Sequence, residues 1–277
     1  MKNLQNLHTH STFCDGKHTP EEMVLFALKK GFDSIGFSGH SYMSFSEGYS
    51  MSLQGTEQYK KHIAELKEKY NEQIEIFLGL EFEMYSDEVL ENGFDLSGYD
   101  YLIGSSHYIK IGDEIVGFDR KAIDVKNVID NYFGGNGLLF CKKYYEDFSK
   151  LYTYGNFDII GHFDIISKTV EQIPHFDENC KEYLDFAFEC VAALKGKIPF
   201  FEVNTGPIAR GYKSKPYPSI PILKELKNQG FNAVISSDCH NGNFLDSDFE
   251  MARELLTLAG FKERYILTKN GFKAVEI

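Results

Sequence analysis

Short apolar runs alternate with longer amphipathic segments along most of the chain. The short runs are mostly rich in β-branched and aromatic residues, which is typical of β-strands. Seven strands are predicted, at Leu4–His8, Ser34–Gly39, Ile74–Glu81, Tyr101–Ser106, Phe157–His162, Phe200–Asn204 and Asn232–Ser237. Strands that alternate with helices favour a parallel sheet with right-handed crossovers.

Helix signals are found between most of these strands. Thr19 and Pro20 supply a cap and a first helical position, acidic residues follow, and Gly31 ends the helix. Similar helices are predicted at about Thr56–Tyr70, Asn179–Lys195, Ser219–Gln229 and Asp248–Ala259. The stretch Ile109–Tyr154 is longer than one crossover and contains Gly-Gly-Asn-Gly at 134–137. It therefore predicts two helices around a loop.

Seven strand and helix units suggest that the sheet closes into a barrel. The chain has 277 residues, which exceeds the usual domain length of roughly 100–200 residues, but α/β barrels of about 250 residues fold as one unit. No linker or repeat divides the sequence. We therefore predict one α/β barrel domain over residues 1–277, with its chemistry at the C-terminal ends of the strands.

The apolar content fits a large buried core and no membrane span. Hydrophobic residues make up 43% of the chain, yet no apolar run reaches the ~18 residues that a membrane helix needs. The first residues, Met1–Asn6, lack the apolar stretch of a signal peptide. We expect a cytoplasmic protein that does not bind membranes.

Charge and cysteine content exclude further classes. The net charge of -12 disfavours a broad nucleic-acid-binding surface, because such surfaces need clustered Lys and Arg. The five cysteines form no Cys-x-x-Cys pair, which argues against a disulfide framework and a structural zinc knot. The sequence leaves the oligomeric state open.

Histidines and acids recur near the ends of the predicted strands. His8 and His10 are two residues apart, so both can point the same way from one strand end and bind one ion. Asp238 and His240 repeat this spacing near the other end of the chain. Imidazole nitrogens combined with carboxylate oxygens suit Zn, Mn or Fe, whereas an all-oxygen set would suit Mg or Ca. The pattern predicts a multinuclear metal site and a metallohydrolase.

The ordered motifs resemble those of the polymerase and histidinol phosphatase (PHP) superfamily. They are His8-Thr9-His10, Gly39-His40-Ser41, Gly79-Leu80-Glu81, Ser106-His107, Gly161-His162-Phe163-Asp164 and Ser237-Asp238-Cys239-His240. The chain looks most like the stand-alone histidinol-phosphatase branch, which also matches the 202–206 and 217–219 segments. The resemblance implies a distorted seven-stranded (β/α) barrel with a trinuclear metal centre.

The resemblance also implies which residues bind each of three divalent ions. His8, His10, Glu81 and Asp238 would hold one ion, Glu81 would bridge to a second held by His107 and His162, and Asp15, His40 and His240 would hold a third.

The assignment of Asp15 has a rival. Many relatives place a histidine near this position, whereas this chain reads Phe-Cys-Asp-Gly-Lys-His at 13–18. We prefer Asp15 as the ligand and keep His18 as the alternative.

Such a centre suits the hydrolysis of phosphate esters. Clustered divalent cations can lower the pKa of a bridging water, orient a phosphate and stabilise the charge on the attacking and leaving oxygens. A metal-bound hydroxide would then attack phosphorus in line. Protonation of the leaving alkoxide needs a nearby acid, for which His18 and Asp15 are the candidates.

Phosphate binding also needs fixed cations, and the substrate needs partners for its other groups. Arg210 could make a two-pronged contact with phosphate, and Lys168 and Lys213 are further candidates. Glu83 could accept the substrate's amine or simply face the barrel mouth, and Ser105 could donate a hydrogen bond. A separate acid, Asp164, is expected to support a ligand rather than to bind metal, since it lies two residues after His162.

Three functions are compatible with the sequence. The resemblance favours a histidinol-phosphatase that releases L-histidinol and phosphate in histidine biosynthesis. The same kind of site could act on a nucleotide or on an oligonucleotide end, although the acidic chain argues against the oligonucleotide. A catalytically silent metal-binding scaffold is the third alternative. A small phosphate monoester is thus the expected substrate.

Overall fold

The computed structural model describes residues 3–45, 48–86 and 96–277. Seven parallel strands form one sheet in the order β1-β2-β3-β4-β7-β8-β9. Their bounds are Gln5–Asn6, Ser34–Phe37, Glu75–Glu83, Tyr101–Ser105, Ile159–Ile160, Phe200–Asn204 and Asn232–Ser236. A parallel bridge between Thr9 and Cys239 links the two ends of the sheet. This nearly closed barrel confirms the predicted fold.

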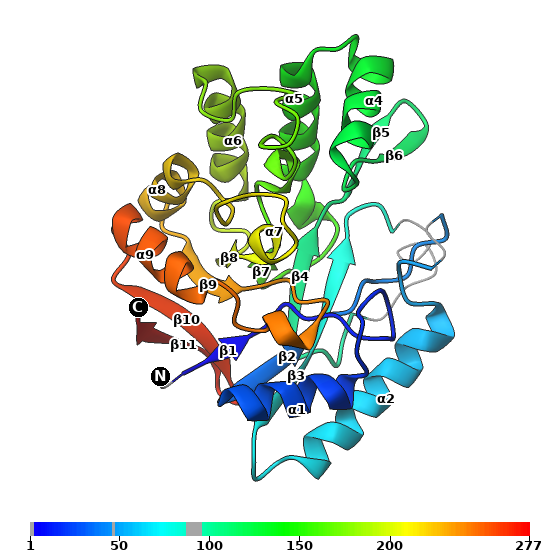
Figure 1. Ribbon diagram of the computed structural model, residues 1–277, viewed down its shortest axis with the longest axis vertical. Coiled ribbons are helices and arrows are strands. Elements are labelled where there is room, and N and C mark those ends of the chain that lie inside the picture. Colours follow the sequence, from blue (N-terminus) through cyan, green and yellow to red (C-terminus); the bar gives the residue numbers. More distant parts are fainter. Residues whose placement is uncertain (1–2, 46–47, 87–95) are drawn as a thin grey trace.

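Helices cover the outside of the sheet, with α4, α5 and α6 on one side and α1 and α2 on the other (Figure 1). The helices of three or more turns are α1 Pro20–Lys30, α2 Leu53–Lys69, α4 Ala122–Phe133, α5 Gly137–Phe148, α6 Lys181–Leu194 and α9 Phe249–Ala259. The shorter helices are α7 Gly206–Ala209, α8 Ile220–Asn228, η1 Leu151–Thr153, η2 Ile165–Ser167 and η3 Gly242–Phe244.

Local sequence fixes the first helix as predicted. Thr19 and Glu22 form a reciprocal capping box, in which each side chain binds the other residue's backbone amide. Gly31 ends α1 in the left-handed conformation, with φ of 75°. Helix α2 begins three residues before the predicted start, because Ser52 rather than a later residue caps it.

The long segment after β4 contains the two predicted helices and an additional hairpin. Strands β5 (Tyr108–Ile111) and β6 (Glu114–Gly117) pair antiparallel before α4 begins. Gly112 takes a left-handed conformation in the turn, with φ of 61°. This hairpin was not predicted from the sequence, because each strand has only four residues.

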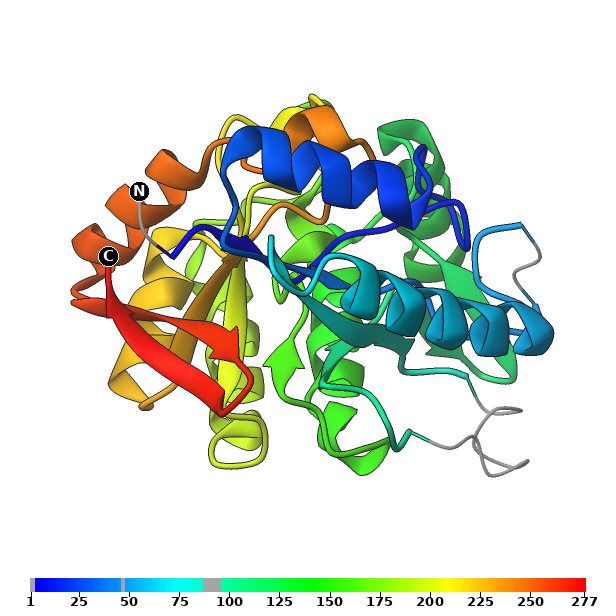
Figure 2. The ribbon, with the colours of Figure 1, turned by 90° about the horizontal axis from the view of Figure 1, so that it is seen from below.

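A second hairpin, also not predicted, packs against the barrel. Strands β10 (Glu263–Thr268) and β11 (Gly271–Glu276) lie alongside β9 (Figure 2). The Gln5 side chain donates to the carbonyl of Leu267 at 2.8 Å and accepts from its amide at 2.7 Å. The hairpin is thereby joined to β1.

Tyr101 fixes the spacing of strands inside the barrel. Its buried hydroxyl donates to the carbonyls of Leu7 and Phe37. Its ring lies against Gly79, where a Cβ would stand 2.3 Å from the ring. Only glycine fits at that position, two residues before Glu81 on β3.

The cysteines and the helices bear on two of the expectations from the sequence. All five cysteines are free, as expected from their spacing. Within the three described ranges, no helix combines the length and apolar character that crossing a membrane requires.

Candidate metal centre

The nine predicted ligands meet where the parallel strands end. They project from the ends of β1, β2, β3, β4, β7 and β9 or from the loops that follow. Their donor atoms form four groups, each with atoms within 4.8 Å of one another. The groups are His10, Asp15, His40 and His240; His8, Glu81 and His162; His8, His10 and Asp238; and His40, Glu81 and His107.

Glu81 lies at the centre of this arrangement. Its Oε1 is 2.8 Å from Nε2 of His162, and its Oε2 is 2.8 Å from Nδ1 of His40. Nε2 of His8 lies 3.2 Å from the same Oε2. The side chain is only 1% exposed. One carboxylate therefore faces imidazoles from three different strand ends.

His8 and His10 occupy neighbouring positions, as their spacing predicts. Their ring centres are 5.2 Å apart. The Asp238 Oδ1 atom lies 3.5 Å from Nε2 of His8 and 3.2 Å from Nε2 of His10. The first and last strands of the barrel thus contribute to one group.

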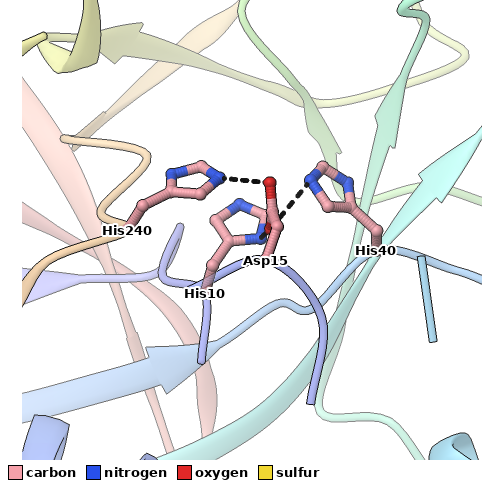
Figure 3. A group of neighbouring side chains, drawn as sticks. All are labelled: His10, Asp15, His40 and His240. Atoms are coloured by element: carbon pink, nitrogen blue, oxygen red, sulfur yellow. Dashed lines mark hydrogen bonds and ion pairs between the residues drawn. The ribbon is translucent and has the colours of Figure 1, made fainter. Parts of the chain in front are cut away.

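Asp15 stands between the imidazole rings of His240 and His40 (Figure 3). Its Oδ2 lies 3.1 Å from Nε2 of His240, and its Oδ1 lies 3.5 Å from Nε2 of His40. The turn that places it is tight, because a Cβ on Gly16 would stand 2.4 Å from the Ser11 amide nitrogen.

His18 is not brought into any of these groups. Its Nε2 lies 3.2 Å from Oδ1 of Asn241, and its Nδ1 lies 3.9 Å from the exposed Glu22. The geometry therefore favours Asp15 over His18 as a member of the cluster.

The cluster contains buried polar atoms that lack hydrogen-bond partners among the described residues. They are Nε2 of His8, His10 and His40, Oε2 of Glu81, Oδ1 of Asp15 and Nδ1 of His162. Each unsatisfied buried group costs roughly 1–3 kcal/mol. Coordination of a cation would satisfy the first five, and a mixed set of imidazole and carboxylate donors fits divalent ions such as Zn, Mn or Fe.

Electrostatics keeps two of these donors, Glu81 and His10, in metal-binding forms. Burial would raise the pKa of Glu81, but His40, His8 and His107 outweigh it and hold the pKa well below its usual range. Burial lowers the pKa of His10 to about 3, and the nearby His240 and His40 act in the same direction. The carboxylate is therefore ionised and the His10 ring neutral, as metal coordination requires.

Glu202 supports the cluster and was not assigned a role from the sequence. It lies inside β8 and is 1% exposed. His8 donates from Nδ1 to its Oε2 at 2.9 Å, and the His162 amide donates to its Oε1 at 2.6 Å. Ser236 donates its hydroxyl to Oε2 at 2.6 Å. A charged residue within an otherwise apolar strand was the signal that could have identified it.

Glu83 and Asp164 have different partners. Glu83 Oε2 accepts from the amide of His107 at 3.0 Å and from its Nδ1 at 2.8 Å, so this acid orients a candidate ligand. Asp164 instead accepts from the hydroxyls of Tyr145 and Tyr183. It makes no described hydrogen bond to His162. Its role is therefore to support the packing between α5, α6 and the loop after β7.

The three candidate phosphate-binding cations differ in position. Arg210 donates to Asp238 Oδ2 at 2.8 Å and has a side chain 27% exposed. It therefore adjoins the cluster and is accessible. Lys213 is directed elsewhere, because its ammonium donates to Glu178 at 2.5 Å and to Ser167 at 2.8 Å.

Lys168 and Ser105 have less direct links to the cluster. Lys168 forms an ion pair with Asp119, and its ammonium lies 4.4 Å from the centre of the Tyr212 ring. The Ser105 hydroxyl is fully buried beside Gly161 and has no hydrogen-bond partner in the described part of the chain.

Two more side chains border the cluster, and neither was singled out from the sequence. The Tyr49 ring stacks on His40 with ring centres 4.1 Å apart. Asp119 follows the β5–β6 hairpin. Burial would raise the pKa of Asp119, but Lys168, then His107, outweigh it and lower the pKa to about 2.

Comparisons with known proteins agree with this geometry. The PHP domain family model matches residues 6–206. The "Histidinol-phosphatase" of Bacillus subtilis is 24% identical over 260 residues, covering 88% of this chain and 96% of that protein. The "DNA polymerase/3'-5' exonuclease PolX" of the same organism is 31% identical over 243 residues, covering 87% of this chain but 35% of that protein.

A solved structure has the same fold. It is the histidinol phosphate phosphatase of Lactococcus lactis, described as complexed with Zn, L-histidinol and phosphate. The two chains are 23% identical and superpose with a TM-score of 0.69, covering 98% of this chain and 99% of the other.

Proposed function

Because the chain belongs to the PHP domain family, we propose that it is a metal-dependent phosphatase that hydrolyses L-histidinol phosphate to L-histidinol and phosphate. The observation that carries this proposal is the set of overlapping donor groups around Glu81 at the C-terminal strand ends. The substrate is supported by the Bacillus relative and by the Lactococcus structure, which cover most of this chain.

We assign three divalent ions to the cluster, each a Zn, Mn or Fe ion. Following the family resemblance, the first would be held by His8, His10, Glu81 and Asp238, the second by Glu81, His107 and His162, and the third by Asp15, His40 and His240. The observed donor groups share members with these sets but divide them differently, since His107 is grouped with His40 and Glu81, and His162 with His8 and Glu81. When bound, such ions supply Lewis acidity and an activated water for phosphate-ester hydrolysis. The overlap of the donor groups at Glu81 supports its role as a shared ligand.

The protein's own side chains would orient the donors and the substrate. Glu202 and Glu83 fix the rings of His8 and His107, so that the other nitrogen of each ring faces Glu81. Arg210 is positioned by Asp238 and still exposes part of its guanidinium for phosphate oxygens. Of the three candidate cations, Arg210 is therefore the one that we assign to phosphate.

Proton donation to the leaving alkoxide is assigned by exclusion. Burial would raise the pKa of Asp15, but His40 and His240 outweigh it and hold the pKa far below its usual range. Asp15 therefore stays ionised and serves as a ligand. His18, whose ring contacts the side chain of Asn241, is the remaining candidate acid.

A second candidate is a phosphoesterase that acts on a nucleotide or an oligonucleotide end. The 31% identity to PolX favours it, although the match covers only about a third of that protein. The net charge of -12 weighs against a long polyanionic substrate.

A phosphate-release assay decides between the two candidates. The purified protein, loaded in turn with Mn, Zn and Fe, is given L-histidinol phosphate, nucleoside monophosphates and an aryl phosphate. We expect kcat/KM for histidinol phosphate to exceed that for any nucleotide by at least about tenfold, or roughly 1.4 kcal/mol. A nucleotide preferred by that margin would replace the proposed substrate but retain the phosphoesterase site.

A further inference from the structure

The β5–β6 hairpin begins next to the candidate ligand His107 and brings the chain back to the same residue. It begins directly after His107, and Tyr108 pairs with Gly117 at its open end. The amide of Phe118 then donates to the carbonyl of His107 at 3.1 Å. The next residue, Asp119, is thereby placed at the edge of the metal cluster.

Asp119 lies near two basic side chains, Lys168 and Arg210. Its Oδ1 accepts a hydrogen bond from Lys168, and its charge also interacts with His107 and Arg210. The carboxylate is 22% exposed, so a ligand can reach it. No hydrogen bond to Oδ2 occurs among the described residues, which leaves this oxygen for another donor.

On its own, a carboxylate in this position disfavours the binding of a phosphate group. It repels the phosphate dianion and partly neutralises Lys168, which would otherwise attract that dianion. The arrangement favours a substrate only if the substrate carries a positive group close to its phosphate. In L-histidinol phosphate the ammonium stands on the carbon next to the one that bears the ester oxygen.

We propose that Asp119 accepts a hydrogen bond from the substrate's ammonium group and so selects aminoalkyl phosphates over other phosphate monoesters. This inference rests on the proposed function and assigns a specificity residue to it. Arg210 binds the phosphate group of the substrate, and Asp119 binds the adjacent ammonium group. A neutral or anionic group on that carbon would leave Oδ2 of Asp119 desolvated and without a hydrogen-bond donor, which is the costly outcome that creates specificity.

Glu83, the acid that the sequence analysis nominated for the amine, fits this role less well. It is 2% exposed, and its Oε2 already accepts both hydrogen bonds from His107. Oε1 of Glu83 has no hydrogen-bond partner among the described residues, but it is buried. Oδ2 of Asp119 is also available and belongs to a carboxylate that is partly exposed.

The test compares two substrates that differ only in the amine. They are L-histidinol phosphate and its deamino counterpart, 3-(imidazol-4-yl)propyl phosphate, assayed with the metal-loaded wild type and with Asp119→Asn. We expect the wild type to favour the amine-bearing substrate by at least about tenfold in kcat/KM. Asp119→Asn should reduce this ratio to within about threefold of unity, and Asp119→Glu should restore part of it.

Two controls separate charge recognition from other effects. Asp113→Asn makes the same change in the exposed turn of the same hairpin and should leave the ratio unaltered. Lys168→Met removes the partner of Asp119 and should change kcat/KM for both substrates in similar proportion.

The outcomes are distinguishable. If Asp119→Asn slows both substrates equally, Asp119 only positions Lys168 and the inference is wrong. If the wild type hydrolyses both substrates equally well, amine selection is absent while the phosphatase assignment stands. If the wild type hydrolyses neither, the proposed function and this inference both fail.

Discussion

His8 donates its Nδ1 hydrogen to Glu202, whose Oε2 lies 2.9 Å away, while Nε2 of the same ring lies 3.2 Å from Glu81. Since a carboxylate can only accept, this contact places a proton on Nδ1, so Nε2 is the nitrogen that would bind a metal ion. Glu202 also binds the His162 amide and the Ser236 hydroxyl. One buried acid therefore links three strand ends.

Glu202→Gln should weaken metal binding without removing a candidate ligand. Glutamine replaces one acceptor oxygen of the carboxylate with an NH2 group that donates. His8, Ser236 and the backbone amide of His162 all donate to this carboxylate in the wild type. Loss of such a supporting contact typically costs 10–100-fold in metal affinity or activity, and we expect a decrease of about that size. Competition with a chromogenic chelator measures the affinity. Glu263→Gln, in the exposed start of β10, is the matched control, and equal affinities in both variants would contradict the prediction.

Asp15→Asn and His18→Ala distinguish the two candidates for the third ion. Asp15 lies between His40 and His240, whereas His18 contacts Asn241. We expect Asp15→Asn to lower the metal content by about one ion per chain, and His18→Ala to retain the wild-type content. Elemental analysis of the dialysed proteins measures both. The reverse pattern would reassign the ligand to His18.

Arg210→Ala should impair all phosphate monoesters in similar proportion, because phosphate is their common group. We expect kcat/KM to fall by about tenfold or more, and Arg210→Lys to recover only part of it, since lysine lacks the two-pronged guanidinium. Metal content must be measured in parallel because Arg210 also binds Asp238. Arg253→Ala, on α9, serves as the control. A decrease in kcat/KM for only one substrate would show that Arg210 contacts a substrate group other than phosphate.

Asp164 makes a pH-dependent contribution to stability. Burial raises its pKa to about 6, so the folded state binds this proton more tightly than the unfolded state, whose pKa is about 3.9. Its stabilising contribution is therefore present below about pH 4 and is lost as the pH rises through about 6, by roughly 3 kcal/mol at most.

Asp164→Asn cannot lose a proton in this range. The difference in unfolding free energy between the variant and the wild type should therefore shift in favour of the variant from pH 4 to pH 7. Urea titrations of the two metal-loaded proteins at both pH values measure it, and pH effects of the other groups cancel in the difference. A difference that is constant with pH would show that the pKa is not raised.

The barrel could be predicted because short apolar runs mark the strands, and most residues of the cluster because histidines and acids recur near the ends of those runs. The resemblance to the PHP superfamily implied Asp15 and the grouping of the ligands. The spacing of His8 and His10 places two rings on one face of a strand end. The acid and histidine at 238 and 240 do the same at the far end of the chain. Parallel strands bring these ends together whatever the length of the connecting helices.

The remaining features depend on contacts between distant segments. The partners of Glu202 lie up to 194 positions away in sequence, so its role could not be assigned from its neighbours. The β5–β6 hairpin has strands of only four residues, too short for a clear alternating pattern. The pairing of Lys213 with Glu178 likewise depends on how the loops after β7 and β8 pack. Sequence spacing alone therefore could not show that the Lys213 ammonium pairs with Glu178.

The central claim is that Glu81 is shared between metal ions on which turnover depends, and the direct measurement is metal content and phosphate release for Glu81→Gln beside the wild type. The account predicts about three ions per chain in the wild type. In the variant it predicts the loss of at least one ion and of nearly all turnover, because a neutral amide is a much weaker ligand than a carboxylate. A Glu81→Gln protein with wild-type metal content and full activity on histidinol phosphate would contradict it.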